Sequence, residues 1–176
     1  LLVAEGETTR FIGDVLAVVV ADSRRRARAA AATVEVGYDV LDPVTSPEAA
    51  LTPGAPEIHD GGNLLEVCSF RRGDVDAALA SSAHTVEATF RTQRVEHAFL
   101  EPEAALAVPD DERLTVHSQG QGVHDDQRQI AAILAVDSDR VRVELVSNGG
   151  AFGGKEGRSV QGHAALAAHL LGRPVR

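Results

Sequence analysis

The hydrophobic and polar positions along the first part of the chain predict a strand, a helix and a second strand. Residues 15–20 form a continuous apolar run, which indicates a strand. Residues 23–32 are rich in arginine and alanine and follow Asp22, so they predict a helix. Its four arginines are typical of a solvated helix face rather than of a nucleic-acid site. Apolar and polar residues alternate again over 33–40, which predicts the second strand.

The strand and helix patterns both end before residues 42–63, which contain four prolines and three glycines. They leave room only for a short turn near 47–51. This stretch is longer than most connections inside a domain, so we expect a domain boundary within it. We therefore place a first domain at 1–45, a linker at 46–63 and a second domain at 64–176.

The second part of the chain predicts a mixture of strands and helices. The strand patterns cover residues 64–70, 84–93, 104–108, 113–118 and 141–146. The turn at 109–112 predicts that the third and fourth of these strands form a hairpin. Helical spacing of apolar residues predicts longer helices at 123–134 and 159–171.

A short helix is also predicted after Asp74, whose side chain is suited to cap its first turn. We expect three apolar residues of this helix to face a core: Val75, Ala78 and Leu79.

The least generic segment is 148–156, which contains four glycines in six positions and ends in Lys155 and Glu156. It connects a predicted strand to a predicted helix. Glycine permits positive φ and lets a ligand approach bare peptide N–H groups, and a helix N-terminus favours negative charge. The segment thus predicts a site for an anion or a metal-oxo group, although a plain tight turn would use the same residues.

A phosphate-binding loop is a further alternative for this segment. Gly149, Gly154 and Lys155 match the pattern, but Glu156 occupies the position where Ser or Thr would hold magnesium. A carboxylate there would repel phosphate, and Phe152 would place a ring inside a loop that normally wraps phosphate closely. Nucleotide binding therefore stays the less favoured alternative.

A second strand-to-helix loop lies at 118–122 and contains Gln121 between two glycines. If its strand lies beside the strand at 141–146, both loops open onto one sheet edge, where ligands bind in α/β architectures. The Gln121 amide can donate hydrogen bonds to a neutral oxo or carbonyl group without adding charge. An exposed loop amide is the alternative.

Residues 95–103 concentrate three carboxylates and an imidazole, which are typical of metal or acid–base sites. His97 and Glu101 would share a helix face, but Pro102 disfavours helical geometry at Glu101. The segment therefore favours structural hydrogen bonding near the site over a zinc centre.

Composition narrows the classes of function further. The 176 residues are 44% hydrophobic, which is enough for a buried core. Lysine and arginine number 17 against 26 acidic residues, and the net charge of −9 argues against nucleic acid or an anionic membrane as partner. Cys68 is the only cysteine, so the chain alone cannot form a disulfide or an iron–sulfur cluster. We expect a soluble, cytoplasmic protein.

Three segments taken together resemble the molybdenum-binding subunit of the xanthine dehydrogenase and aldehyde oxidase family of molybdenum hydroxylases: residues 95–103, 120–122 and 149–156. Residues 11–20 and 33–38 are similar to the end of that family's a/b hammerhead domain. The resemblance implies an α+β fold. It would comprise the C-terminal half of a hammerhead domain and the first part of a molybdopterin-binding domain, with a mixed sheet and flanking helices.

The resemblance also implies roles for individual residues. Gln121 would hydrogen-bond an oxo ligand of molybdenum, an indirect metal contact. Gly150, Phe152 and Gly153 would line the molybdopterin through backbone contacts. Glu156 would contact the substrate and favour a purine such as xanthine or hypoxanthine; an aldehyde or another N-heterocycle is the alternative.

The family hydroxylates its substrates with water-derived oxygen and passes electrons to [2Fe-2S] clusters and usually to FAD. The resemblance thus implies these cofactors on other domains or subunits, the rest of the molybdenum subunit as a partner, and an oligomer. The family's general-base glutamate lies beyond the position of Arg176. We therefore assign no catalytic residue here and expect the 176 residues alone to be inactive.

Overall fold

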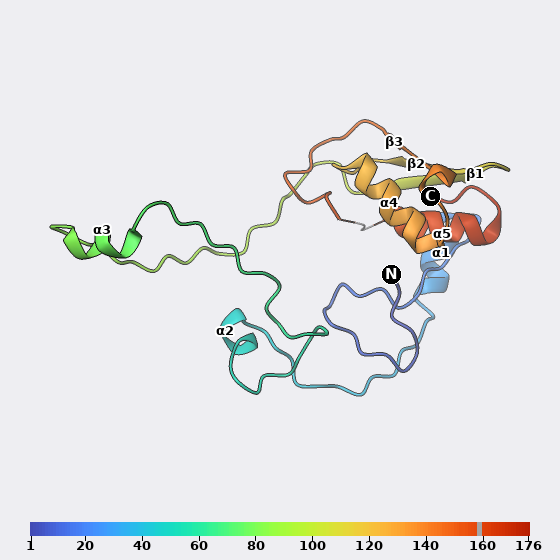
Figure 1. Ribbon diagram of the computed structural model, residues 1–176. Helices are drawn as coiled ribbons and strands as arrows, with labels where there is room; N and C mark the ends of the chain where they lie inside the picture. The colour runs from blue at the N-terminus through green and yellow to red at the C-terminus, as the bar shows by residue number, and fades with distance from the viewer. Residues whose placement is uncertain (158–159) are drawn as a thin grey trace. The chain divides into compact units, whose positions relative to one another are not determined.

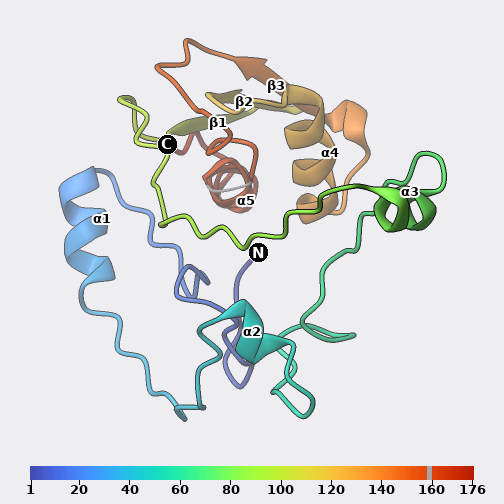
Figure 2. The same ribbon diagram turned by 90° about the vertical axis from the view of Figure 1, so that its left-hand side faces the viewer.

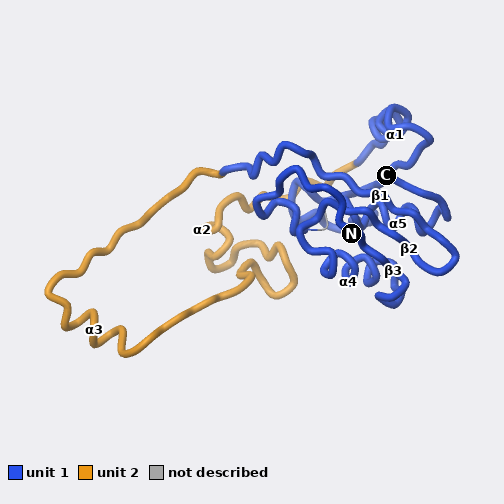
Figure 3. The backbone as a smooth tube through the Cα atoms, turned by 90° about the horizontal axis from the view of Figure 1, so that it is seen from above, with its two compact units in different colours: residues 1–36, 95–176 blue, residues 37–94 orange. Residues whose placement is uncertain are grey.

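A computed structural model describes residues 1–157 and 160–176 of the chain. The chain divides into two compact units (Figure 3): residues 1–36 with 95–176 form unit 1, and residues 37–94 form unit 2. All strands and all buried residues among those described lie in unit 1. The candidate site must therefore be built from unit 1.

Unit 1 contains a three-stranded sheet in the order β1 (Ala105–Pro109), β2 (Leu114–Ser118), β3 (Val141–Leu145) (Figure 1). Strands β1 and β2 are antiparallel, which confirms the predicted hairpin. In its turn the Asp110 carboxylate accepts the N–H groups of Glu112 and Arg113, both at 2.8 Å. Strands β2 and β3 are parallel, so the sheet is mixed, as expected.

Two helices, α4 (Val123–Leu134) and α5 (Gln161–Leu171), lie on the same face of the sheet (Figures 1 and 2). Helix α4 and the 3₁₀ turn η1 (Ser138–Arg140) connect β2 to β3. Both predicted helices are confirmed, except that Ser159 of the second range lies outside the described residues. At the ends of α4 and α5, Ala135 and Gly172 adopt left-handed conformations, which stop the helices.

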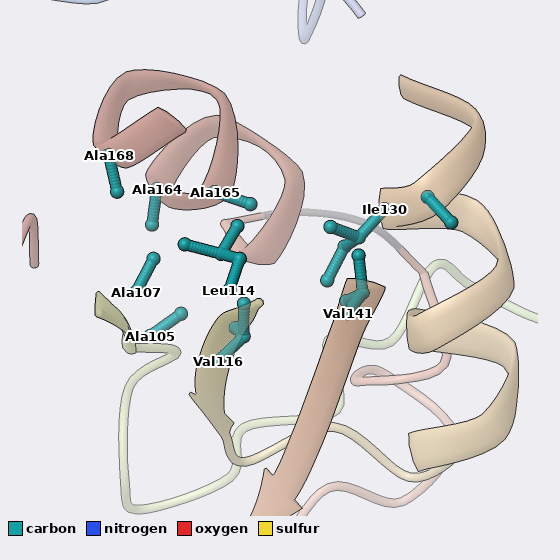
Figure 4. Close-up of a cluster of buried hydrophobic side chains, with 10 residues drawn as sticks. Ala105, Ala107, Leu114, Val116, Ile130, Val141, Ala164, Ala165 and Ala168 are labelled. Carbon is teal, nitrogen blue, oxygen red and sulfur yellow. The ribbon is translucent and has the colours of Figure 1, made fainter. Parts of the chain in front are cut away.

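The core lies between this sheet and the two helices (Figure 4). Alternate strand residues point toward the helices: Ala105, Ala107, Leu114, Val116 and Val141. Helix α5 meets β1 with alanines, among them Ala165 and Ala168, which are fully buried. Because alanine side chains are short, the helix backbone lies close to the sheet. Helix α4 adds Ile130, which points toward Val141 (Figure 4).

The remaining helices are short and solvated. Helix α1 (Arg24–Ala31) in unit 1 and helices α2 (Pro47–Ala50) and α3 (Val75–Ser81) in unit 2 contain no buried residue. Each helix is preceded by a residue whose side chain accepts a backbone N–H of the first turn. These capping residues are Ser23, Ser46 and Asp74 for α1, α2 and α3 respectively. The predicted cap at Asp74 and the solvated arginine helix are confirmed. The inward orientation predicted for Val75, Ala78 and Leu79 is wrong, since all three are exposed.

Four predicted strands are absent: 15–20, 33–40, 64–70 and 84–93. Their sequences have strand periodicity, but none pairs in a ladder with another part of the described chain. Their large apolar residues accordingly remain exposed, as at Phe90, 89%. The periodicity indicates extended chain, but a strand also requires a partner for its backbone groups.

The described part of the chain contains no helix that is long and apolar enough to cross a bilayer.

Candidate functional site

Two loops leave the same edge of the sheet because β2 and β3 are parallel neighbours (Figure 1). We call residues 119–122 the glutamine loop and residues 146–157 the glycine loop. They lie next to each other: the N–H of Val146 donates to Ser118 O at 2.9 Å, and Asn148 Nδ2 donates to Gln119 O at 2.6 Å. The expectation that both loops open on one edge is confirmed.

Gln121 is hydrogen-bonded to the glycine loop through both its backbone and its side chain. Its N–H donates to Lys155 O at 3.0 Å. Its side-chain oxygen accepts the N–H groups of Gly153 at 3.1 Å and Lys155 at 3.3 Å. The oxygen is thereby committed, and the amide NH₂ has no acceptor among the described residues. Gln121 can therefore present a neutral hydrogen-bond donor at the sheet edge.

The turn of the glycine loop uses left-handed backbone conformations. Gly150 has φ +101° and Gly153 has φ +87°, which glycine adopts readily, while Phe152 has φ +53°. The N–H groups of Gly150, Ala151 and Phe152 find no acceptor in the part of the chain that the structure describes. Three successive N–H groups thus have no partner in the described chain; Ala151 is buried, whereas Phe152 is exposed, and the N–H of Gly153 is already held by Gln121.

A third segment, residues 97–101, packs against the glycine loop. A Cβ built on Gly154 would come within 2.9 Å of the His97 and Phe99 rings. A Cβ on Gly149 would lie 2.5 Å from the Cβ of Glu101. Glycine is therefore required at both positions by close approach rather than by φ.

Glu101 hydrogen-bonds both loops. One carboxylate oxygen accepts Gln119 Nε2 at 2.6 Å, and the other accepts the N–H of Gly149. The structural hydrogen bonding that the sequence favoured for residues 95–103 is therefore present at Glu101.

Lys155 is buried, with 1% of its surface exposed. Its ammonium donates to the backbone oxygen of Glu101 at 2.9 Å and lies 4.6 Å from the centre of the Phe99 ring, a cation–π contact. A phosphate-binding loop needs this ammonium to reach the phosphates. The geometry of Lys155 therefore argues against the nucleotide-binding alternative.

A buried polar network lies beneath the glutamine loop. The Ser118 hydroxyl donates to Asp126 Oδ2 at 3.0 Å and accepts the Gly120 N–H at 2.9 Å and Gln161 Nε2 at 3.2 Å. Burial raises the pKa of Asp126, and the neighbouring Asp125 charge also raises it, whereas the Ser118 hydrogen bond lowers it. The network joins β2, α4 and α5 at the point where the glutamine loop begins.

Glu156 is exposed, and its side chain contacts no hydrogen-bond or ionic partner among the described residues. It follows the buried Lys155 directly, and its carboxyl group faces solvent.

The sequence did not identify the roles of Glu101, Lys155 or the Ser118 network. Glu101 and Lys155 are 54 residues apart, and neither position has a local periodic signal. A lysine after two glycines is normally expected at the surface. The one available hint was the carboxylate-rich composition of residues 95–103.

Comparison with known proteins identifies the ligand class. Residues 58–176, more than half of the chain, match the family model of the molybdopterin cofactor-binding domain. The chain belongs to the molybdenum hydroxylases. The predicted resemblance is confirmed, and molybdopterin is the cofactor of this family.

The molybdenum hydroxylase relatives are considerably longer than this chain. The xanthine dehydrogenase molybdenum-binding subunit of Escherichia coli O157:H7 is 34% identical over 169 residues, 95% of this chain and 22% of that protein. The nicotinate dehydrogenase large molybdopterin subunit of Eubacterium barkeri is 36% identical over 171 residues, 97% of this chain and 40% of that protein. The chain thus spans less than half of each relative.

Among solved structures, quinoline 2-oxidoreductase from Pseudomonas putida 86 superposes with a TM-score of 0.83 and 33% sequence identity. The match covers 96% of this chain and 22% of that one. The α+β fold with a mixed sheet is therefore that of molybdenum hydroxylases.

The residues at the sheet edge fit a molybdopterin cofactor. The cofactor offers hydrogen-bond acceptors, and the edge presents the Gln121 amide with the free N–H groups of residues 150–152. Glycine at positions 150 and 153 allows the positive φ of this turn and adds no side chain to it.

Proposed function

We propose that the chain is part of a molybdenum hydroxylase that hydroxylates a purine, such as xanthine or hypoxanthine, with water-derived oxygen. Electrons would then pass to [2Fe-2S] clusters and usually to FAD, on other domains or subunits. This proposal includes the rest of the molybdenum subunit as a partner and an oligomeric, cytoplasmic enzyme.

The observation that carries the proposal is the orientation of Gln121. Two loop N–H groups hold its side-chain oxygen, so its NH₂ is the group left to donate to an oxo ligand of molybdenum. Gly150, Phe152 and Gly153 would line the pterin with their backbone. When bound, the cofactor supplies the redox chemistry and oxygen transfer, while these residues bind and orient it.

Glu156 supports a purine as the substrate. Its exposed carboxyl group has no partner among the described residues, and it directly follows the buried Lys155. A carboxylate can accept hydrogen bonds from the ring N–H groups of a purine such as xanthine, whereas an aldehyde group carries no N–H donor. Another N-heterocycle is the alternative, because two of the similar proteins are named for nicotinate and quinoline.

The substitution Glu156→Gln in the intact subunit tests this assignment. It keeps the shape of the side chain and removes one acceptor and the charge. We expect kcat/KM for xanthine to fall about tenfold or more, at unchanged molybdenum and pterin content, because a hydrogen bond to a charged group is lost. Glu112→Gln, in the β1–β2 turn at the other end of the sheet, is the control. An unchanged kcat/KM for every purine tried would rule out the purine contact.

The domain division stays part of the proposal: a partial hammerhead domain at 1–45, a linker at 46–63 and a partial molybdopterin-binding domain at 64–176. The family match begins at residue 58, inside the proposed linker, which supports a boundary near there.

A further inference from the structure

Glu101 contacts the two site loops from a third segment of the chain. Its carboxylate accepts Gln119 Nε2 with one oxygen and the Gly149 N–H with the other. Gln119 lies two residues before Gln121, and Gly149 lies one residue before the three free N–H groups. One side chain therefore connects the parts of both loops that offer donors to the cofactor.

The chemistry of these contacts requires a carboxylate. Both partners are N–H donors, so both oxygens must act as acceptors, which an ionised carboxylate provides and an amide does not. The space is also closely fitted, because a Cβ at Gly149 would lie 2.5 Å from the Glu101 Cβ. Glu101 thus holds both loops by direct contact, in addition to the hydrogen bonds that join the loops to each other.

Lys155 fixes the other end of the glycine loop to the same segment. Its ammonium donates to the backbone oxygen of Glu101 at 2.9 Å, and its own backbone is hydrogen-bonded to Gln121 in both directions. The glycine loop is therefore held at both ends by contacts to Glu101, at Gly149 and at Lys155.

We propose that Glu101 and Lys155 are a positioning pair that sets the distance between the Gln121 amide and the N–H groups of residues 150–152. Neither side chain contacts the cofactor in this arrangement; both act through the loops. The identity of the positioned ligand rests on the proposed function, while the coupling of the two loops rests on the contacts alone.

The test compares Glu101→Gln with Glu101→Asp and Glu112→Gln in the intact subunit. Glutamine sets an N–H donor against one of the two donors, whereas aspartate keeps two acceptors on a shorter side chain. Amide hydrogen exchange of peptides covering 119–122 and 147–157 reports on loop coupling. Pterin fluorescence after dialysis and oxidation reports on cofactor retention.

We expect both loops of Glu101→Gln to exchange about tenfold faster or more, and pterin to be lost faster by a similar factor. Glu101→Asp should be intermediate, and Glu112→Gln should match the wild type. If both loops of Glu101→Gln exchange their amide hydrogens at the wild-type rate, the proposal that Glu101 and Lys155 position the loops is wrong. Wild-type protein that contains no pterin would instead overturn the proposed function, and loop exchange would still decide the pair.

Lys155→Met serves as the second variant if Glu101→Gln does not fold. Methionine keeps most of the side-chain volume and removes the donor to Glu101. The glycine loop should then exchange faster in folded protein, and a wild-type rate there would count against the pair.

Discussion

Gln121 and Lys155 are hydrogen-bonded to each other in both directions: the Gln121 N–H donates to Lys155 O at 3.0 Å, and the Gln121 side-chain oxygen accepts the Lys155 N–H at 3.3 Å. The same oxygen also accepts the Gly153 N–H. Gln121 consequently has two separable tasks, holding the glycine loop with its oxygen and presenting its NH₂ to the cofactor.

Two substitutions at Gln121 separate these tasks. Gln121→Glu keeps an acceptor for both loop N–H groups but replaces the outward donor with a carboxylate oxygen, which would repel an oxo ligand. We expect kcat to fall about tenfold or more with little change in the free energy of unfolding. Gln121→Ala also leaves the loop donors without a partner, so it should destabilise the protein by about 1–3 kcal/mol.

Steady-state kinetics normalised to molybdenum content, together with urea unfolding, measure both effects. A Gln121→Glu enzyme with wild-type kcat would refute the donor role. Equal unfolding curves for Gln121→Ala and Gln121→Glu would refute the loop-holding role.

A matched pair of glycines tests the close approach beneath the glycine loop. In Gly149→Ala the new methyl group would lie 2.5 Å from the Glu101 Cβ, so the loop or the segment must shift. We expect a loss of about 1–3 kcal/mol in the free energy of unfolding and weaker pterin retention. At Gly157 a Cβ would meet nothing within 4 Å, so Gly157→Ala should stay within about 1 kcal/mol of the wild type.

Denaturant unfolding of both variants, with pterin analysis, provides the comparison. If both alanine variants unfold alike, the contact between Gly149 and Glu101 does not determine the loop position.

Among the strands that the sequence predicted, the three that form are those that find a partner strand in the sheet: β1 pairs with β2, and β2 with β3. The hairpin of β1 and β2 and helix α4 follow one another, and each buries the face that its period indicates. Residues 15–20 and 84–93 have similar strand patterns but remain unpaired. The periodic pattern indicates which face of an extended segment could be buried. It does not indicate whether a neighbouring strand is present to pair with that segment.

The site was predictable to the same extent. Glycine spacing located both loops, but the sequence placed them at one edge only on the condition that their strands are neighbours, which the pairing of β2 with β3 shows. Sequence patterns do not assign Glu101 and Lys155, because their function arises from contacts across 54 residues. The glycine pattern suggests Lys155 only as a phosphate ligand, and its burial becomes visible only in the folded chain.

The buried network beneath the glutamine loop predicts a specific pH dependence. Burial raises the pKa of Asp126 above its ordinary value of 3.8. The folded protein therefore binds this proton more tightly than the unfolded chain does. The stabilising contribution is fully present below the ordinary pKa, and it is lost as the pH rises through the raised folded-state value.

Asp126→Asn removes this titration but keeps an oxygen that accepts the Ser118 hydroxyl. We therefore expect the stability of the variant, relative to the wild type, to increase as the pH rises from about 4 to about 7. Urea unfolding at several pH values measures the difference, with Asp137→Asn, at an exposed aspartate, as the control for loss of one charge. A difference that is flat or decreases with pH would show that burial does not hold the Asp126 proton, and that the network is ionised without penalty.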